Sequence, residues 1–159
     1  MKYPILLVLL FASVLSACGN DSTLKSPTEP ISPTESQSTK PVEARSVEDQ
    51  ASFVAALESA GATVETGEPV TQPFFSSEGS MIKINGADVQ VFEYDSAEAM
   101  ENEASQVAPD GGSIGTSMVN WMDTPHFHKA DRIIVLYVGS DETILSLLES
   151  VIGPQFAGR

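Results

Sequence analysis

The sequence has little cysteine, little tryptophan and few basic residues. Cys18 is the one cysteine in 159 residues, so no disulfide can form within the chain and the fold must rest on packing alone. The chain also has a single tryptophan. Eight lysines and arginines face 22 aspartates and glutamates, which gives a formal net charge of −14 at pH 7.

The excess of negative charge belongs to one part of the chain. Residues 1–45 hold four of the eight basic and four of the 22 acidic side chains, so residues 46–159 hold eighteen acidic and four basic ones. Such a domain repels phosphate backbones and anionic lipid surfaces, and we therefore expect no nucleic-acid partner. The charge is otherwise typical of a solvated, soluble surface.

The sequence has no apolar run long enough to span a bilayer comfortably. The longest run, Ile5–Leu15, covers about a dozen residues and follows the positive charge of Lys2. The small residues Ser16 and Ala17 come next. This order of charge, apolar run and small residues predicts a signal peptide over residues 1–17.

The four residues Leu15-Ser16-Ala17-Cys18 resemble the lipobox of bacterial lipoprotein precursors. The resemblance implies that the Cys18 thiol receives a diacylglyceryl group, that cleavage occurs before Cys18, and that the new N-terminus is acylated, for example with palmitate. Two or three acyl chains would hold the protein durably in the cell envelope, on the exported (periplasmic or extracellular) side of a bacterial membrane. The alternative is a plain secretory signal cut after Ala17, which would leave Cys18 as a free thiol.

The segment after the cysteine is poor in large apolar residues. Thirteen of the 27 residues in 19–45 are serine, threonine or proline, and no core can form from such a composition. We therefore expect residues 18–45 to be a lipidated cysteine followed by a disordered tether. Residues 46–159 are then a single globular domain, long enough to bury a core.

Hydrophobic periodicity predicts an α+β domain with about three helices. Ser46, with Asp49 three residues later, is expected to cap the first helix, and Gly61 to end it. The dipeptide Asn85-Gly86 is the strongest short hairpin signal. The expected elements are a helix over 47–60, a strand near 62–66, a hairpin centred on 85–86, a helix over 96–107, a second hairpin that contains 133–138, and a last helix that ends at Gly153.

The two hairpins differ in their patterns. Val89–Tyr94 alternates, as a strand with one wet face does, whereas Ile133–Val138 is apolar throughout and should be central and covered on both faces. A shift of 44 residues places the 85–86 turn on Lys129-Ala130 and the helix cap Ser96 on Ser140. This likeness predicts two repeated ββα units.

Together these patterns predict a mainly antiparallel sheet of four to six strands. The helices of the two units should pack on one face of the sheet. The other face would be covered in part by the first helix, by the loop with Phe74 and Phe75, or by a partner.

The stretch 111–115 matches G-x-S-x-G around Ser113, and Asp123 and His126 follow in the order of α/β-hydrolases. A nucleophile elbow needs a buried strand before the serine and a helix after it, whereas here a helix and a turn precede Ser113 and a strand-like segment follows. The domain is also about half the size that such a fold requires. No catalytic residue is therefore nominated, and no enzyme activity or cofactor is predicted.

His126 and His128 lie at positions i and i+2, which share one face of a strand, and Asp123 comes three residues earlier. Two imidazoles and a carboxylate could hold a divalent transition metal or a small ligand. The domain has no thiol and no third histidine for a closed zinc site. The alternative is that both histidines are ordinary strand residues.

Aromatic residues gather in two proline-containing stretches. Phe74 and Phe75 lie in one, and Trp121 and Phe127 lie in the other. Packing in the core is one explanation. The alternative is that the two loops meet in an apolar recognition patch rimmed by acidic groups.

Stretches such as "INGADVQVFEY" and "RIIVLYVG" make the domain similar to small exported bacterial proteins with no known activity. That resemblance implies no mechanism. The sequence favours a tethered, non-catalytic domain that binds an envelope protein, a peptide or a cell-wall component. The alternative function is a metal or small-ligand protein that uses Asp123, His126 and His128.

Overall fold

The computed structural model describes residues 46–159. The predicted signal peptide, the lipidated Cys18 and the tether lie outside the described residues, and they stay predictions. Within the described part, no helix has both the length and the apolar character needed to cross a membrane.

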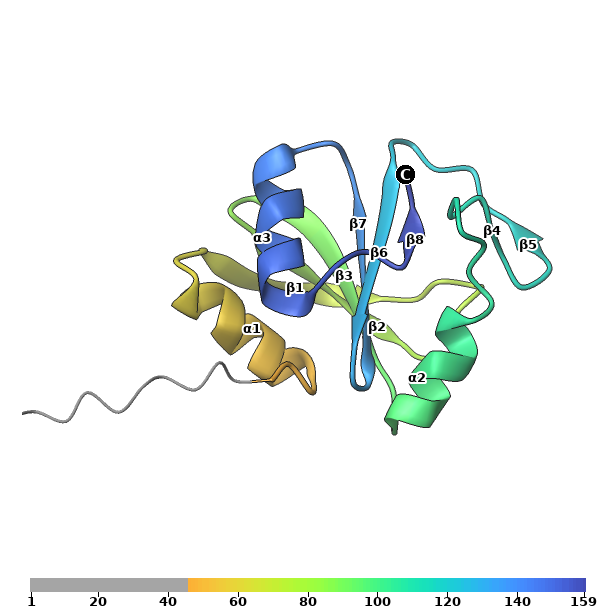
Figure 1. The fold of residues 1–159 in the computed structure, drawn as a ribbon, viewed down its shortest axis with the longest axis horizontal. Coiled ribbons are helices and arrows are strands. Elements are labelled where there is room, and N and C mark those ends of the chain that lie inside the picture. Colours follow the sequence, from red (N-terminus) through yellow and green to blue (C-terminus); the bar gives the residue numbers. More distant parts are fainter. Residues whose placement is uncertain (1–45) are drawn as a thin grey trace, which may run out of the picture. The chain divides into compact units, whose positions relative to one another are not determined.

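The described residues form one large antiparallel sheet and three helices (Figure 1). The six strands are ordered β1-β2-β3-β7-β6-β8, and each neighbouring pair is antiparallel. The strands of the sheet are β1 (Val64–Val70), β2 (Gly79–Ile84), β3 (Ala87–Glu93), β6 (Pro125–Ala130), β7 (Ile133–Val138) and β8 (Ala157–Gly158). The predicted α+β class, the antiparallel sheet and the number of helices are confirmed.

The helices cover both faces of this sheet. Helices α1 (Gln50–Ser59) and α3 (Glu142–Ile152) pack on one face, and α2 (Ala97–Ala104) packs on the other (Figure 1). A separate two-stranded hairpin, β4 (Ser113–Ile114) and β5 (Ser117–Met118), follows α2. The first helix thus shares a face with the last one, and the prediction that α2 and α3 share a face is wrong.

Two hydrophobic cores result, one on each face. On the first face, Phe53 and Leu57 of α1 and Leu148 of α3 are fully buried against β2, β3 and β7. On the second face, α2 and the loops around it bury a set of mostly aromatic and aliphatic side chains: Phe75, Phe92, Tyr94, Met100, Ala104, Val107, Ile114, Phe127, Ile134, Leu136 and Ala157. Adjacent side chains along one strand therefore point to opposite faces of the sheet and pack in different cores.

The central position of β7 is confirmed. Ile133 through Tyr137 are buried, because alternate side chains enter the two cores. Its neighbour β3 also lies inside the sheet, and the expectation of one wet face is confirmed only in part. Val89 and Val91 are buried toward α1 and α3, whereas on the other face Phe92 is buried below α2, Gln90 is half-buried and Asp88 is exposed. Gln90 and Glu93 are the polar positions that gave the strand its alternating pattern, and both are half-buried. The side-chain oxygen of Gln90 accepts a hydrogen bond from the amide N–H of Gln72.

Two of the three predicted helix caps are corrected. The first helix begins after Asp49, whose Oδ1 accepts the Ser52 N–H at 2.8 Å while Ser52 Oγ accepts the Asp49 N–H, so the capping box lies three residues after Ser46. Asp141, not Ser140, caps α3 by accepting the Thr143 N–H at 2.8 Å. Both observed caps are aspartates whose carboxylate accepts a backbone N–H of the first helical turn. The Ser96 cap is confirmed.

The structure does not confirm the two repeated units. The second hairpin turns at Asp131-Arg132, two residues beyond the position given by the 44-residue shift. The strands β3 and β7 are antiparallel neighbours, so the two-fold axis that would superimpose the β2–β3 hairpin on the β6–β7 hairpin is perpendicular to the sheet. A rotation about this axis does not exchange the two faces of the sheet, so equivalent helices would lie on the same face. The following helices, α2 and α3, nevertheless lie on opposite faces. The two ββα units therefore differ in handedness.

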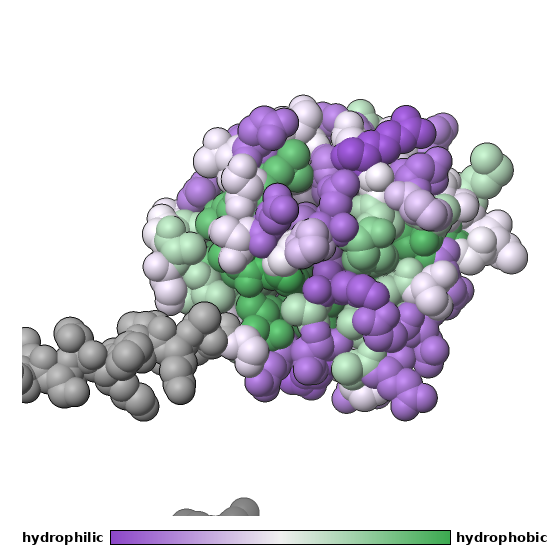
Figure 2. Space-filling view, viewed as in Figure 1, coloured by the Kyte–Doolittle hydropathy of each residue, from purple (hydrophilic) through white to green (hydrophobic). Residues whose placement is uncertain are grey.

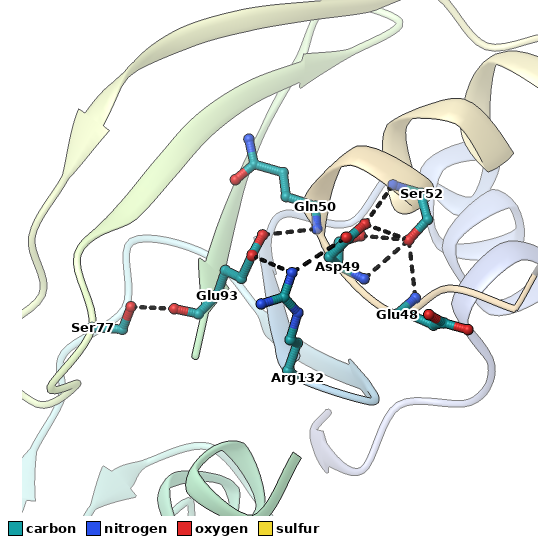
Figure 3. A network of polar contacts seen from close by, with 7 residues as sticks. All are labelled: Glu48, Asp49, Gln50, Ser52, Ser77, Glu93 and Arg132. Carbon is teal, nitrogen blue, oxygen red and sulfur yellow. Dashed lines mark hydrogen bonds and ion pairs between the residues drawn. The ribbon is translucent and has the colours of Figure 1, made fainter. Parts of the chain in front are cut away.

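Arg132 joins the start of α1 to the sheet (Figure 3). Its guanidinium lies 2.9 Å from Glu93 Oε1 and 3.3 Å from Asp49 Oδ2. Glu93 Oε2 also accepts the Gln50 N–H at 3.0 Å, and the Glu93 carbonyl accepts the Ser77 hydroxyl. The Ser52 hydrogen bonds, with help from Arg132, lower the pKa of Asp49. These contacts are those of a structural network, because every group in it already has a partner.

Candidate functional site

The segment between α2 and β6 covers the second face of the sheet beside α2. Val107 and Ile114 form an isolated bridge, and Ile114 is buried in the core, so the β4–β5 hairpin is anchored at its base. Ser113 lies in β4 and is followed by a turn and β5 rather than by a helix. This is not the geometry of a nucleophile elbow.

The indole of Trp121 is held in place by this segment. Its Nε1–H donates to the carbonyl of Gly111 at 2.6 Å. Its ring lies 5.9 Å from the ring of Phe74 and 5.8 Å from that of Phe127, both in edge geometry. A side chain with a satisfied N–H and two aromatic neighbours has little rotational freedom, so Trp121 is oriented before any ligand arrives.

The structure thus brings the four predicted aromatic residues together. Phe74 and Phe75 are in edge contact at 5.1 Å, and Trp121 joins them to Phe127. Phe75 and Phe127 are buried in the core and are not accessible to a partner. Phe74 and Trp121 are partly exposed and form the accessible part of the cluster.

A hollow of about 360 Å³ lies beside Trp121, and we call it the Trp121 hollow. Asp110 Oδ1 accepts the Gly112 N–H at 2.9 Å, and Asp123 Oδ1 accepts the Thr124 N–H at 2.7 Å. Local backbone bonds therefore fix both carboxylates. The lining residues are Asp110, Gly112, Val119, Asn120, Trp121, Asp123, Thr124, Pro125 and Arg159.

Two methionines that are adjacent in sequence to residues lining this hollow are fully exposed. Met118 in β5 has 92% of its surface exposed, and Met122, the residue after Trp121, has 102%. They are the exposed large hydrophobic side chains of residues 46–159. Sequence reasoning missed Met118, which sits on a strand of two residues with both side chains exposed. Their position on one short segment marks it as different from the acidic surface elsewhere.

The two histidines lie on the other side of β6, toward α3. His126 Nδ1 is 2.7 Å from Gln155 Oε1 and its Nε2 is 3.1 Å from the Gly139 carbonyl oxygen. Each ring nitrogen therefore has a polar neighbour, and the one that carries the proton of a neutral ring donates to it. His128 Nδ1 is 2.8 Å from the Gly153 carbonyl. Both side chains are buried. They line a second hollow of about 360 Å³ together with Glu142, Leu145, Glu149, Pro154, Gln155 and Arg159.

The three predicted metal ligands do not converge. The histidines share one face of β6, as predicted, but Asp123 lies in the bend before the strand and lines the Trp121 hollow instead. Across residues 46–159, no three His, Cys, Asp or Glu side chains are grouped so that they could hold a metal ion. The bend separates Asp123 from the two histidines, and the Asp123 carboxylate instead accepts the N–H of Thr124.

Comparison with known proteins gives no guide to this site: no family model, no curated protein and no solved structure matches the chain. Function is therefore inferred from the hollows, charges and exposed side chains described above. Of the two hollows, the one beside Trp121 combines an oriented aromatic wall with exposed apolar neighbours. The second hollow is lined by His126 and His128, whose ring nitrogens already contact other groups of the domain. The Trp121 hollow is the stronger candidate site.

His128 should make the domain less stable as the pH falls below about 6.5. A carbonyl only accepts, so Nδ1 carries the proton of the neutral ring, and Nε2 has no partner within residues 46–159. Burial, and to a lesser degree the nearby charge of His126, lowers the pKa of His128 against the opposing effects of the Gly153 carbonyl and Glu149. The unfolded chain then binds the proton more readily than the folded one, so the free energy of unfolding falls with falling pH.

The variant His128→Asn keeps an N–H near the Gly153 carbonyl but cannot titrate. Urea unfolding of both proteins between pH 7.5 and 5 measures the difference, which can reach about 1.4 kcal/mol per pH unit for one proton. Parallel stability curves for the two proteins would show that His128 takes up its proton as easily in the folded state as in the unfolded one.

Proposed function

We propose that the chain is a lipid-anchored protein of the bacterial cell envelope whose acidic domain binds a partner at the Trp121 hollow. The observation that carries this proposal is the grouping of an oriented, partly exposed tryptophan with two fully exposed methionines on one segment. Figure 2 shows one face of the domain, on which hydrophilic side chains are widespread and hydrophobic ones are visible between them. Exposed apolar side chains gathered at one place on a charged surface are typical of binding sites.

Methionine is suited to such a site. Its unbranched, polarisable side chain adapts to irregular partner surfaces, and here it does no packing inside the domain. Tryptophan supplies large contact area at a low cost in conformational entropy when its ring is already fixed. The domain needs no catalytic group for this role. For the alternative function, a metal centre, residues 46–159 hold no group of three His, Cys, Asp or Glu side chains that includes the two histidines.

The anchor half of the proposal rests on the sequence around Cys18. The lipobox-like residues, the polar segment after them and a folded start near residue 46 fit a domain held at a distance from a membrane. The acidic charge of the domain fits the same arrangement, because an anionic lipid surface would repel it.

Cys18→Ser should release the protein from the membrane fraction. The reason is that the acyl chains attach through the thiol, and their loss removes the hydrophobic free energy that holds the chain at the bilayer. Fractionation of cells followed by immunoblotting measures the release, and circular dichroism of the released protein should show an unchanged fold. A variant that stays with the membranes would place the anchor elsewhere.

Binding at the hollow is tested by site-specific photo-crosslinking in intact cells. A benzophenone amino acid is placed at Met122 in one protein and at the exposed Ser59, at the end of α1, in a matched control. The proposal expects a discrete crosslinked species from position 122 that is absent from position 59. Equal products from both positions, or none from position 122, would remove the proposed site.

A further inference from the structure

The chemistry of the residues that line the Trp121 hollow indicates which class of ligand it could bind. The indole of Trp121 lines it, and most of the other lining side chains are polar: Asp110, Asn120, Asp123, Thr124 and Arg159. From this combination we infer that the hollow binds a neutral saccharide unit. The inference rests on the proposed function, since it names the ligand class of the same site.

The indole suits the apolar face of a sugar ring. The π face of an aromatic ring carries partial negative charge and attracts the positively polarised C–H bonds of a pyranose. Because Trp121 Nε1–H already donates to the Gly111 carbonyl, a ligand in the hollow can use the apolar ring of Trp121 but not its N–H. The ring is also fixed by Phe74 and Phe127, so binding does not have to restrict it further.

The carboxylates suit sugar hydroxyls. Each one has an oxygen held by a backbone N–H, at Gly112 for Asp110 and at Thr124 for Asp123. The structure shows no hydrogen bond to Oδ2 of Asp123 within residues 46–159, and Oδ2 of Asp110 has only the guanidinium of Arg159 at 3.8 Å. A hydroxyl can donate to these oxygens and accept from Asn120 or Arg159.

The charges of the lining favour a neutral ligand over an ionic one. Asp110 and Asp123 repel phosphates and carboxylates, as does the domain as a whole. A cationic peptide would meet Arg159 in the same hollow. A polyol avoids both penalties and still uses the donors and acceptors.

The size of the hollow is consistent with this ligand. About 360 Å³ lies near the lower end of the range of roughly 300–1,000 Å³ for small-molecule sites. Such a space suits one or two sugar rings, which could belong to a longer chain. The source could be an N-acetylated cell-wall glycan or a plain glucan, since both present the same ring faces and hydroxyls.

The single tryptophan makes the test direct, because all indole fluorescence of the chain comes from Trp121. The mature protein is purified in a detergent without a sugar headgroup and titrated with tetra-N-acetylchitotetraose, cellotetraose and maltotetraose. We expect a saturable change in emission with a Kd of about 1 mM or tighter for at least one of them. Binding of the N-acetylated sugar alone assigns a cell-wall glycan, and binding of the glucans assigns a general neutral glycan.

Variants locate the binding, with calorimetry as the readout. Asp123→Asn keeps an acceptor for Thr124 but loses the charge, and it should weaken binding by about tenfold. Glu58→Gln, on the exposed surface of α1, is the matched control and should bind as the parent does. Trp121→Phe keeps an aromatic wall and should bind more weakly than the parent but more tightly than Trp121→Ala.

The result that overturns the inference is the absence of any emission change or heat with all three sugars at about 10 mM, tenfold above the weakest expected Kd. Equal affinities of Asp123→Asn and Glu58→Gln would overturn the assignment to this hollow. If sugars fail to bind while crosslinking from position 122 still yields a discrete partner, the ligand class is wrong and the proposed function stands. If both fail, the proposed function falls as well.

Discussion

Replacing Phe127 with alanine should destabilise the domain by about 3–5 kcal/mol, the largest loss we expect from any side chain considered as part of the recognition patch. Phe127 is fully buried, and its ring lies 5.8 Å from that of Trp121 and 6.1 Å from that of Phe156. Removing the ring leaves a cavity between β6 and the covering loops. The surrounding structure relaxes only partially into such a cavity, so part of the lost packing is not recovered.

Urea unfolding followed by circular dichroism measures this loss. The matched control is Phe74→Ala, since Phe74 belongs to the same aromatic cluster but is partly exposed, and we expect it to cost no more than about 1.5 kcal/mol. If Phe127→Ala is too unstable to purify, Phe127→Leu should fold with a loss of about 1–1.5 kcal/mol. Similar costs for Phe127→Ala and Phe74→Ala would mean that Phe127 is not a core residue.

One turn and one strand of the sheet were predictable from short stretches of sequence. The Asn85-Gly86 turn is specified locally, because both residues adopt positive φ values, of 51° and 89°. The apolar run Ile133–Val138 likewise predicts a central strand by itself, since a strand without polar positions must be covered on both faces. In both places the decisive interaction lies within a few residues of the signal.

The faces of the sheet could not be predicted in the same way. An amphipathic helix shows that it packs on something, but its sequence does not say which face of the sheet receives it. Here α1 fills the first face beside α3, which leaves α2 for the other face. On that second face α2 covers only part of β3, since Phe92 is buried while Asp88 is exposed, and this partial cover agrees with the alternation of the strand in sequence.

The candidate site was partly predictable for a similar reason. The meeting of the two aromatic loops followed from their composition, since Phe74 and Trp121 need apolar neighbours wherever they lie. The separation of Asp123 from the histidines depends on a backbone bend and one hydrogen bond, which residue spacing does not reveal. The exposure of Met118 could not be predicted from the sequence, because it depends on how the β4–β5 hairpin lies against the rest of the domain.

Gly158→Ala should detach the last strand and cost about 3 kcal/mol, with loss of the Trp121 hollow. Gly158 has a φ of +113°, which side chains rarely adopt. A Cβ there would collide with the carbonyl oxygen of Pro125 and lie 2.9 Å from its carbonyl carbon. The strand would lose its pairing with His126, and Arg159, which lines both hollows, would leave with it.

A substitution at a second glycine, Gly153, separates the cost of backbone strain at Gly158 from the cost of the steric collision there. Gly153 has a similar φ of +98°, but a Cβ there would meet nothing within 4 Å, so Gly153→Ala should cost only the backbone strain of about 1–2 kcal/mol. Urea unfolding of both variants gives the difference, which isolates the close approach of β8 to β6. Hydrogen exchange should then show faster exchange of the Gly158 and Arg159 N–H groups, which donate to Pro109 and Pro125, and of no distant strand. Equal costs for the two variants would mean that β8 can shift to make room. In that case the wall of the hollow that Arg159 provides would be adaptable rather than fixed.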